Sequence, residues 1–163
     1  LNSTNGDIEV GGFAGRLTAT TSNAGITIKR HDGTVIARTS NADIEASDVT
    51  GDVDATTSNS SITLHDVTGR VVALTSNGDI DIHLAASASG PVTATTSNSS
   101  ITLLVGPGFT GELSASTSNG TVECTDARAR STRSGKSSEV FNFGNGTASK
   151  LTTSNGDVTV KPR

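Results

Sequence analysis

The chain has 163 residues, of which 32% are hydrophobic and only 2% aromatic, and its formal net charge is −4. That length fits one domain, but few large side chains are available for a thick globular core. The acidic balance disfavours a nucleic-acid partner, which would require a basic surface. No apolar run approaches the roughly 20 residues of a membrane-spanning helix.

A short Thr-Ser-Asn motif, or a close variant of it, recurs along the whole chain. Successive Asn residues are 18 residues apart four times, and then 21, 21 and 36 residues apart. Repeats of this length indicate a series of similar units that stack on one another. The Asn residues of the motif are Asn5, Asn23, Asn41, Asn59, Asn77, Asn98, Asn119 and Asn155.

Apolar and polar residues alternate on both sides of each motif, as expected for β-strands. Two short strands per repeat, joined by a Ser-Asn turn and by a turn that ends in Gly, are typical of one coil of a β-solenoid. The sequence therefore predicts an all-β, single-domain β-solenoid over residues 1–163, with roughly nine coils that stack in chain order as parallel strands. The general preference of parallel crossovers favours a right-handed coil. The predicted inward positions are Ile8 and Val10 after the first Asn, Leu17, Ala19 and Thr21 before the second, and their equivalents in later repeats.

The regularity changes along the chain. Residues 1–81 keep the 18-residue period, whereas the coils that follow Asn77 and Asn98 each hold three additional residues. Residues 126–146 are irregular and basic, and they contain Phe141 and Phe143. We expect this segment to cap the open end of the solenoid, where unpaired strand edges would invite association. A partner-binding loop is the alternative.

The Asn of the motif is the most constant residue of the repeat. Asn tolerates the backbone angles of a tight turn. In a stack of identical coils its side-chain amide can also donate to the side-chain carbonyl of the Asn one coil away. We therefore predict a structural ladder of all eight Asn residues, with ligand binding as the alternative role.

His65 and His83 occupy the same position in neighbouring coils. Their side chains should lie about 5 Å apart on an outer face, close enough to chelate a metal ion, with Asp66 next in sequence. They are the one candidate metal-binding pair in the sequence, and an accidental surface pair is the alternative. No cofactor is expected.

Acidic residues form two further columns, in which charged and neutral coils largely alternate. Spacing like charges about two coils apart, near 10 Å, reduces their repulsion and favours a role in solubility. A weak calcium-binding edge is the alternative, because calcium requires six to eight oxygen ligands. The two columns are Asp7, Asp43, Asp79 and Asp157, and Glu9, Glu45, Asp81 and Glu123.

Nucleophilic catalysis requires a Ser or Cys beside a His and a carboxylate. The sequence holds three His residues and no Gly-x-Ser-x-Gly motif, and Cys124 is its single Cys. We therefore expect no catalytic residues and no enzyme activity. A polysaccharide-active β-helix enzyme is the less favoured alternative, because a rod this short leaves little room for a substrate groove lined with carboxylates.

The run from Gly146 to Val160 comprises a Gly-containing turn, an alternating strand and Ser-Asn-Gly-Asp-Val. Together with the preceding basic loop and the Thr-Ser-Asn-Gly-Asp-Ile units, it resembles the toast-rack family of bacterial adhesin-like envelope proteins. The resemblance covers nearly the whole chain. It implies a β-solenoid outside the bacterial cytoplasmic membrane, in the cell envelope or secreted, without enzyme activity. Members of the family are often lipoproteins or attached to a membrane helix, so the resemblance also implies possible membrane attachment through a segment outside residues 1–163. Because Leu1 falls within a repeat, we expect the chain to be a processed or trimmed fragment.

These observations lead to one preferred function and three alternatives, of which the polysaccharide-active enzyme is one. We expect a monomeric scaffold or adhesin-like binding module, whose partner is an envelope protein or a surface glycan. A self-associating, filament-forming solenoid is the main alternative. An ice-binding face is disfavoured, because the outward columns mix Thr with charged residues and are not uniform.

Overall fold

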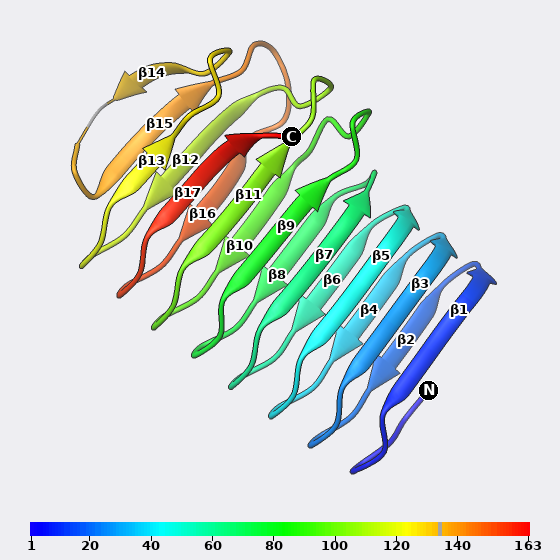
Figure 1. Cartoon of the computed structure of the whole chain (residues 1–163). Helices are drawn as coiled ribbons and strands as arrows, with labels where there is room; N and C mark the ends of the chain where they lie inside the picture. Colours follow the sequence, from blue (N-terminus) through cyan, green and yellow to red (C-terminus); the bar gives the residue numbers. More distant parts are fainter. Residues whose placement is uncertain (134) are drawn as a thin grey trace.

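In the computed structural model, which describes residues 1–133 and 135–163, the chain forms a flattened tube of two facing β-sheets (Figure 1). The first sheet has eight strands in the described residues, in the spatial order β1 (Ile8–Ala14), β3 (Ile26–Asp32), β5 (Ile44–Thr50), β7 (Ile62–Val67), β9 (Ile80–Leu84), β11 (Ile101–Val105), β17 (Val158–Pro162) and β13 (Val122–Cys124). The second sheet has nine, in the order β14 (Arg130–Arg133), β15 (Ser138–Asn142), β12 (Glu112–Ser116), β16 (Ser149–Thr152), β10 (Val92–Thr95), β8 (Val71–Leu74), β6 (Val53–Thr56), β4 (Val35–Arg38) and β2 (Leu17–Thr20).

Neighbouring strands of the first sheet are parallel, and equivalent residues of successive repeats are paired. Ile26, for example, pairs with Ile8 on one side and with Ile44 on the other. The predicted all-β solenoid with parallel stacked strands is therefore confirmed. We call each strand of the first sheet, with its partner strand in the second sheet, a level of the solenoid.

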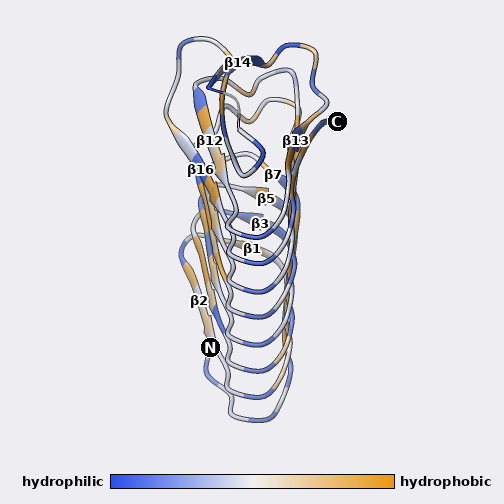
Figure 2. Ribbon diagram, turned by 90° about the vertical axis from the view of Figure 1, so that its left-hand side faces the viewer, coloured by the Kyte–Doolittle hydropathy of each residue, from blue (hydrophilic) through white to orange (hydrophobic). Residues whose placement is uncertain are grey.

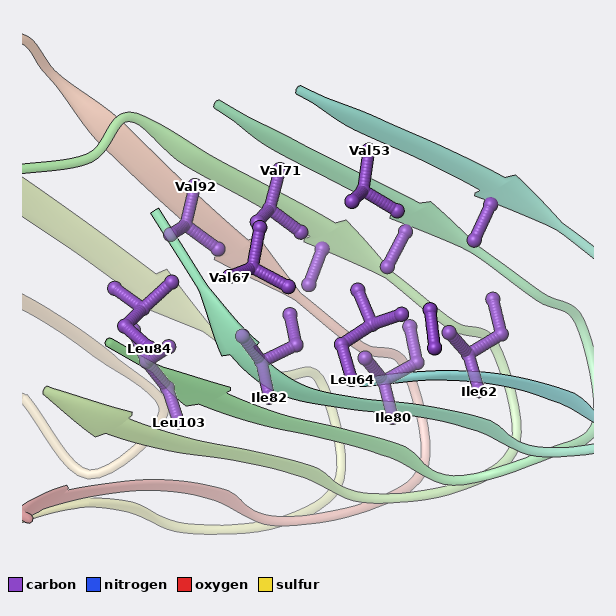
Figure 3. Close-up of a cluster of buried hydrophobic side chains, with 14 of the residues drawn as sticks. Val53, Ile62, Leu64, Val67, Val71, Ile80, Ile82, Leu84, Val92 and Leu103 are labelled. Carbon is purple, nitrogen blue, oxygen red and sulfur yellow. The ribbon is translucent and has the colours of Figure 1, made fainter. Parts of the chain in front are cut away.

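The core is a narrow apolar layer between the two sheets. Side chains of the first sheet, such as Ile62 and Leu64, point towards Val53 and Val71 of the second (Figure 3), and all four are fully buried. Hydrophobic residues alternate with polar ones along the strands, as the colouring of Figure 2 shows. Small Ala residues at the centre of the second sheet, such as Ala55 and Ala73, allow the two sheets to approach closely.

The Thr of each Thr-Ser-Asn motif is buried, and its hydroxyl group finds a partner across the turn. Thr39 Oγ1 donates to the Ala24 carbonyl at 3.1 Å, and Thr57 Oγ1 donates to the Ala42 carbonyl at the same distance. A buried hydroxyl without a partner would cost about 1–3 kcal/mol. The hydrogen bond therefore explains why a polar residue occupies an inward position at this turn.

The predicted stacking order is wrong for the last two repeats. Strand β17 lies between β11 and β13 (Figure 1), and β16 lies between β10 and β12. The C-terminal repeat is thus inserted between two coils that follow one another in the chain. Accordingly, Val158 pairs with both Ile101 and Val122.

Burial of apolar side chains gives a physical reason for this order. Both inward residues of the inserted strand, Val158 and Val160, are completely buried. The inward residues of the terminal strand, Val122 and Cys124, are only partly buried. The inserted strand has two inward Val residues and the terminal strand one Val and one Cys, so the more apolar pair takes the interior level, where it loses the most contact with water.

The first sheet provides eight levels in the described residues, fewer than the nine coils expected. The difference lies in residues 126–146, which contain β14 and β15 and do not form a coil. Strand β15 runs antiparallel to β12, and β14 runs antiparallel to β15, so that both cover the outer edge of the second sheet at this end. At the opposite end, β1 is an edge strand of the first sheet.

A backbone irregularity repeats on four levels of the first sheet. Gly12 has a φ of 65°, and Arg30, Asp48 and Asp66 have φ values of 54°, all in the left-handed region. Strand pairing skips each of them, as in a β-bulge. The irregularity ends at β9, where Leu84 pairs directly with Val67.

None of the described residues forms a helix with the length and apolar character needed to span a membrane.

Candidate functional site

His65 on β7 and His83 on β9 lie one above the other on the outer face of the first sheet, as their shared repeat position predicts. Their Nδ1 atoms are 2.9 Å apart. The ring centroids are 4.3 Å apart, and the ring planes are nearly perpendicular, at 87°. One Nδ1–H must therefore donate a hydrogen bond to the lone pair of the other Nδ1, so at least one of the two imidazoles is neutral.

Burial lowers the pKa of His83 below its ordinary value, and a positive charge on His65 lowers it further. Asp81 and Asp66 act in the opposite direction, and Arg163 adds positive charge. Asp66 itself forms an ion pair with Arg163, whose guanidinium also donates to the Leu84 carbonyl. The histidine pair is thus held within a small cluster of charged groups, and the lowered pKa favours the neutral form of His83.

The third histidine is built differently. His31 is buried, its Nε2 lies 2.9 Å from the Gly15 carbonyl oxygen, and its ring stacks on Phe13. It occupies the position taken by Val49 on the next level. His31 therefore belongs to the core and lies apart from the pair.

The eight Asn side chains form a continuous ladder along one edge of the solenoid. Asn59 Nδ2 donates to Asn41 Oδ1 at 2.8 Å and Asn59 Oδ1 accepts from Asn77 Nδ2 at 3.0 Å. The ladder follows the spatial order of the levels, since Asn119 donates to Asn155 and Asn155 donates to Asn98. The remaining rungs join Asn23 to Asn5, Asn41 to Asn23 and Asn98 to Asn77.

The first acidic column has a structural role that the sequence analysis missed. Each Asp accepts a backbone N–H bond from the neutral level above it, as Asp7 does from Gly25 at 2.9 Å and Asp43 from Ser61 at 3.0 Å. Asp79 and Asp157 bind Ser100 and Thr121 in the same way, and the hydrogen bonds from Thr121 lower the pKa of Asp157.

The alternation of acidic and neutral residues held a signal for the stacking order. Along the chain, Ser100 and Thr121 are two neutral residues in succession. In space, Asp157 lies between them and restores the alternation. Only the first column held this signal: in the second column the inserted Thr159 follows Thr102, so two neutral residues are adjacent in space.

Two shallow hollows on the surface of the described residues can be named by their linings. One, of about 420 Å³, is lined by Asp7, Glu9, Asp43 and Glu45, with Gly25 on the level between the two acidic levels. The other, of about 260 Å³, lies at the N-terminal end beside Leu1, Phe13 and Leu17. Neither hollow contains a histidine or the cysteine.

Two further observations concern metal-binding clusters and the single cysteine. In the described part of the chain, no three side chains of His, Cys, Asp and Glu gather closely enough to hold a metal ion. Burial raises the pKa of the Cys124 thiol, so it is protonated at neutral pH.

Comparisons with known proteins add no further assignment: the chain matches no protein-family model, and no similar curated protein or solved structure is found. The resemblance to the toast-rack family therefore stays a prediction that rests on the repeat residues.

Proposed function

We propose that this chain is a non-catalytic scaffold or adhesin-like binding module of the bacterial cell envelope, related to the toast-rack family. The observation that carries the proposal is the regular outer face of the first sheet. Thr27, Thr63 and Thr102 alternate there with Glu9, Glu45 and Asp81, one residue per level, with their strands in register.

Such a face suits an extended ligand better than a compact one. Parallel strands repeat at about 4.8 Å, so the face offers hydroxyl and carboxylate groups in evenly spaced rows. Many weak contacts along a repetitive ligand add up to useful avidity without a deep pocket. The abundance of hydroxyl and carboxylate groups favours a surface glycan over an apolar protein surface.

Co-sedimentation with isolated bacterial envelopes and with purified cell-wall glycan tests this proposal. The variant Thr63→Lys with Thr102→Lys places two bulky cations on the first sheet, two levels apart. Its matched control is Thr56→Lys with Thr95→Lys, also two levels apart but on the second sheet. We expect the first variant to lose binding and the control to retain it.

Equal binding by both variants, or no binding by the unmodified chain, would contradict the proposal. Turnover of a glycan or a peptide, abolished by one point substitution, would contradict its non-catalytic part.

Self-association is a second candidate, favoured by the N-terminal end of the rod. Strand β1 is an edge strand there, and Leu1 and Phe13 are 62% and 49% exposed beside the apolar hollow. Unpaired strand edges with exposed apolar residues promote association. Light scattering as a function of concentration tests it: Phe13→Glu should reduce association, whereas Leu74→Glu, on a sheet face, should not. A chain that stays monomeric at every concentration would exclude this candidate.

A further inference from the structure

The histidine pair offers two nitrogen atoms that can bind one metal ion, and so can act as a bidentate ligand. His65 and His83 project from adjacent strands whose residues pair in register, so the backbone fixes the separation of the two rings. The Nδ1 atoms face each other at 2.9 Å. Both side chains are partly exposed, which leaves room for further ligands from the solvent.

The 2.9 Å distance between the nitrogen atoms is that of a hydrogen bond in the metal-free pair, so it does not select a coordination geometry. It does place both Nδ1 atoms within reach of one ion, because with metal–nitrogen bonds of about 2.05 Å two ligands lie about 2.9 Å apart at 90° and about 3.3 Å apart at the tetrahedral angle. For a site built from two imidazoles, affinity rises along the divalent first-row metals to Cu²⁺ and falls again at Zn²⁺.

We propose that His65 and His83 form a bidentate binding site for a divalent transition-metal ion, with Cu²⁺ bound most tightly. Each imidazole contributes its Nδ1 lone pair. The proton that the pair shares in the metal-free state moves to Nε2 of the same ring, so no proton need be lost when both rings are neutral. The remaining coordination positions are filled by water.

Charged side chains around His83 act on a bound cation in both directions. Asp81 and Asp66 supply negative potential near His83, while Arg163 opposes a cation. Arg163 is itself paired with Asp66, which limits its effect on the histidines.

Calorimetric titration with Cu²⁺, together with electron paramagnetic resonance, tests the site in the full chain carrying Cys124→Ser, because a free thiol reduces and binds copper. We expect one equivalent of Cu²⁺ with two imidazole nitrogens in its coordination sphere. His65→Asn and His83→Asn should each weaken binding by more than about tenfold, since even loss of an outer-shell partner costs that much.

The matched control is His31→Val, which reproduces the residue found at this core position on the next level. It should leave Cu²⁺ binding unchanged, and thermal unfolding verifies that each variant is folded. Equal affinity of the unmodified chain and both Asn variants would overturn the proposal. A spectrum with fewer than two imidazole nitrogens, or tighter binding of Zn²⁺ than of Cu²⁺, would overturn it as well. Because the proposed envelope function does not depend on the histidines, glycan binding by the Asn variants separates the two claims.

Discussion

The regular coils between Asn5 and Asn77 and the C-terminal third of the chain are built from the same repeat, yet they stack differently. In the regular part, each level rests on the one that precedes it in sequence. In the C-terminal third, residues 149–162 are inserted between two earlier strand pairs. The segment before them contains β15, which pairs with β12 at the edge of the second sheet.

The difference shows that a repeat specifies which residues face inward but does not by itself specify which coil is the neighbour. Any two coils with matching inward residues can pair. The connection decides between them: a short turn forces the next coil to be adjacent, whereas the excursion of residues 126–146 leaves a second choice. Burial of Val158 and Val160 then favours the inserted position.

The largest effect should come from the Gly column that lets successive turns touch in the regular part. A Cβ atom at Gly33 would lie 2.3 Å from the Gly15 carbonyl oxygen, and the Gly33 φ is +130°. Gly33→Ala should therefore lower the free energy of unfolding by at least about 3 kcal/mol, through steric overlap together with backbone strain. Denaturant titration measures it.

Gly15→Ala is the matched control, because Gly15 has a similar φ of +107° but nothing lies within 4 Å of the added atom. It should cost only the strain, roughly 1–2 kcal/mol. Equal costs at the two positions would show that contact between levels does not require glycine.

The Asn ladder distinguishes the inserted coil from stacking in chain order, through smaller losses of stability than at Gly33. Asn155 is an interior rung that both donates to Asn98 and accepts from Asn119, whereas Asn119 only donates. Asn155→Ala should therefore cost about 1–2 kcal/mol, and Asn119→Ala about half of that. Thermal unfolding of the two variants compares them. Stacking in chain order would make Asn155 the terminal rung and reverse the ranking.

The smallest effect concerns the link between the irregular segment and the stack. Asp126 is buried, and hydrogen bonds from Arg128 hold its pKa below the ordinary value. Arg128 also donates to the carbonyls of Gly106 and Pro107. Because the folded-state pKa lies below the unfolded-state value of 3.8, the stabilisation is complete above pH 3.8 and is lost as the pH falls through the folded-state pKa.

Asp126→Asn should therefore flatten the fall of stability on acidification, as measured by denaturant titration across that range. An unchanged slope would mean that other carboxylates govern acid unfolding.

Much of this architecture could be predicted because period-two alternation marks strands regardless of context. The inward positions of Ile26 and Ala37 and the stacking of the histidine pair follow from that alternation and the 18-residue period. Other features depended on contacts that periodicity does not encode. Asp43 bonds to the backbone of the next level, Thr39 bonds across a turn, and Arg30 adopts a left-handed φ. The order of the last coils depended on a comparison of burial between two nearly equivalent strands.

A disulfide bond tests the inserted coil most directly. Cys124 pairs with Val160, and Val160 separates it from Leu103. Adjacent strands bring Cα atoms within the range of about 4.4–6.8 Å that a disulfide requires. Under a mild oxidant, Val160→Cys should lose both free thiols to an intramolecular disulfide, whereas Leu103→Cys should keep them. Disulfide formation in Leu103→Cys and not in Val160→Cys would show that the coils stack in chain order and would contradict the account.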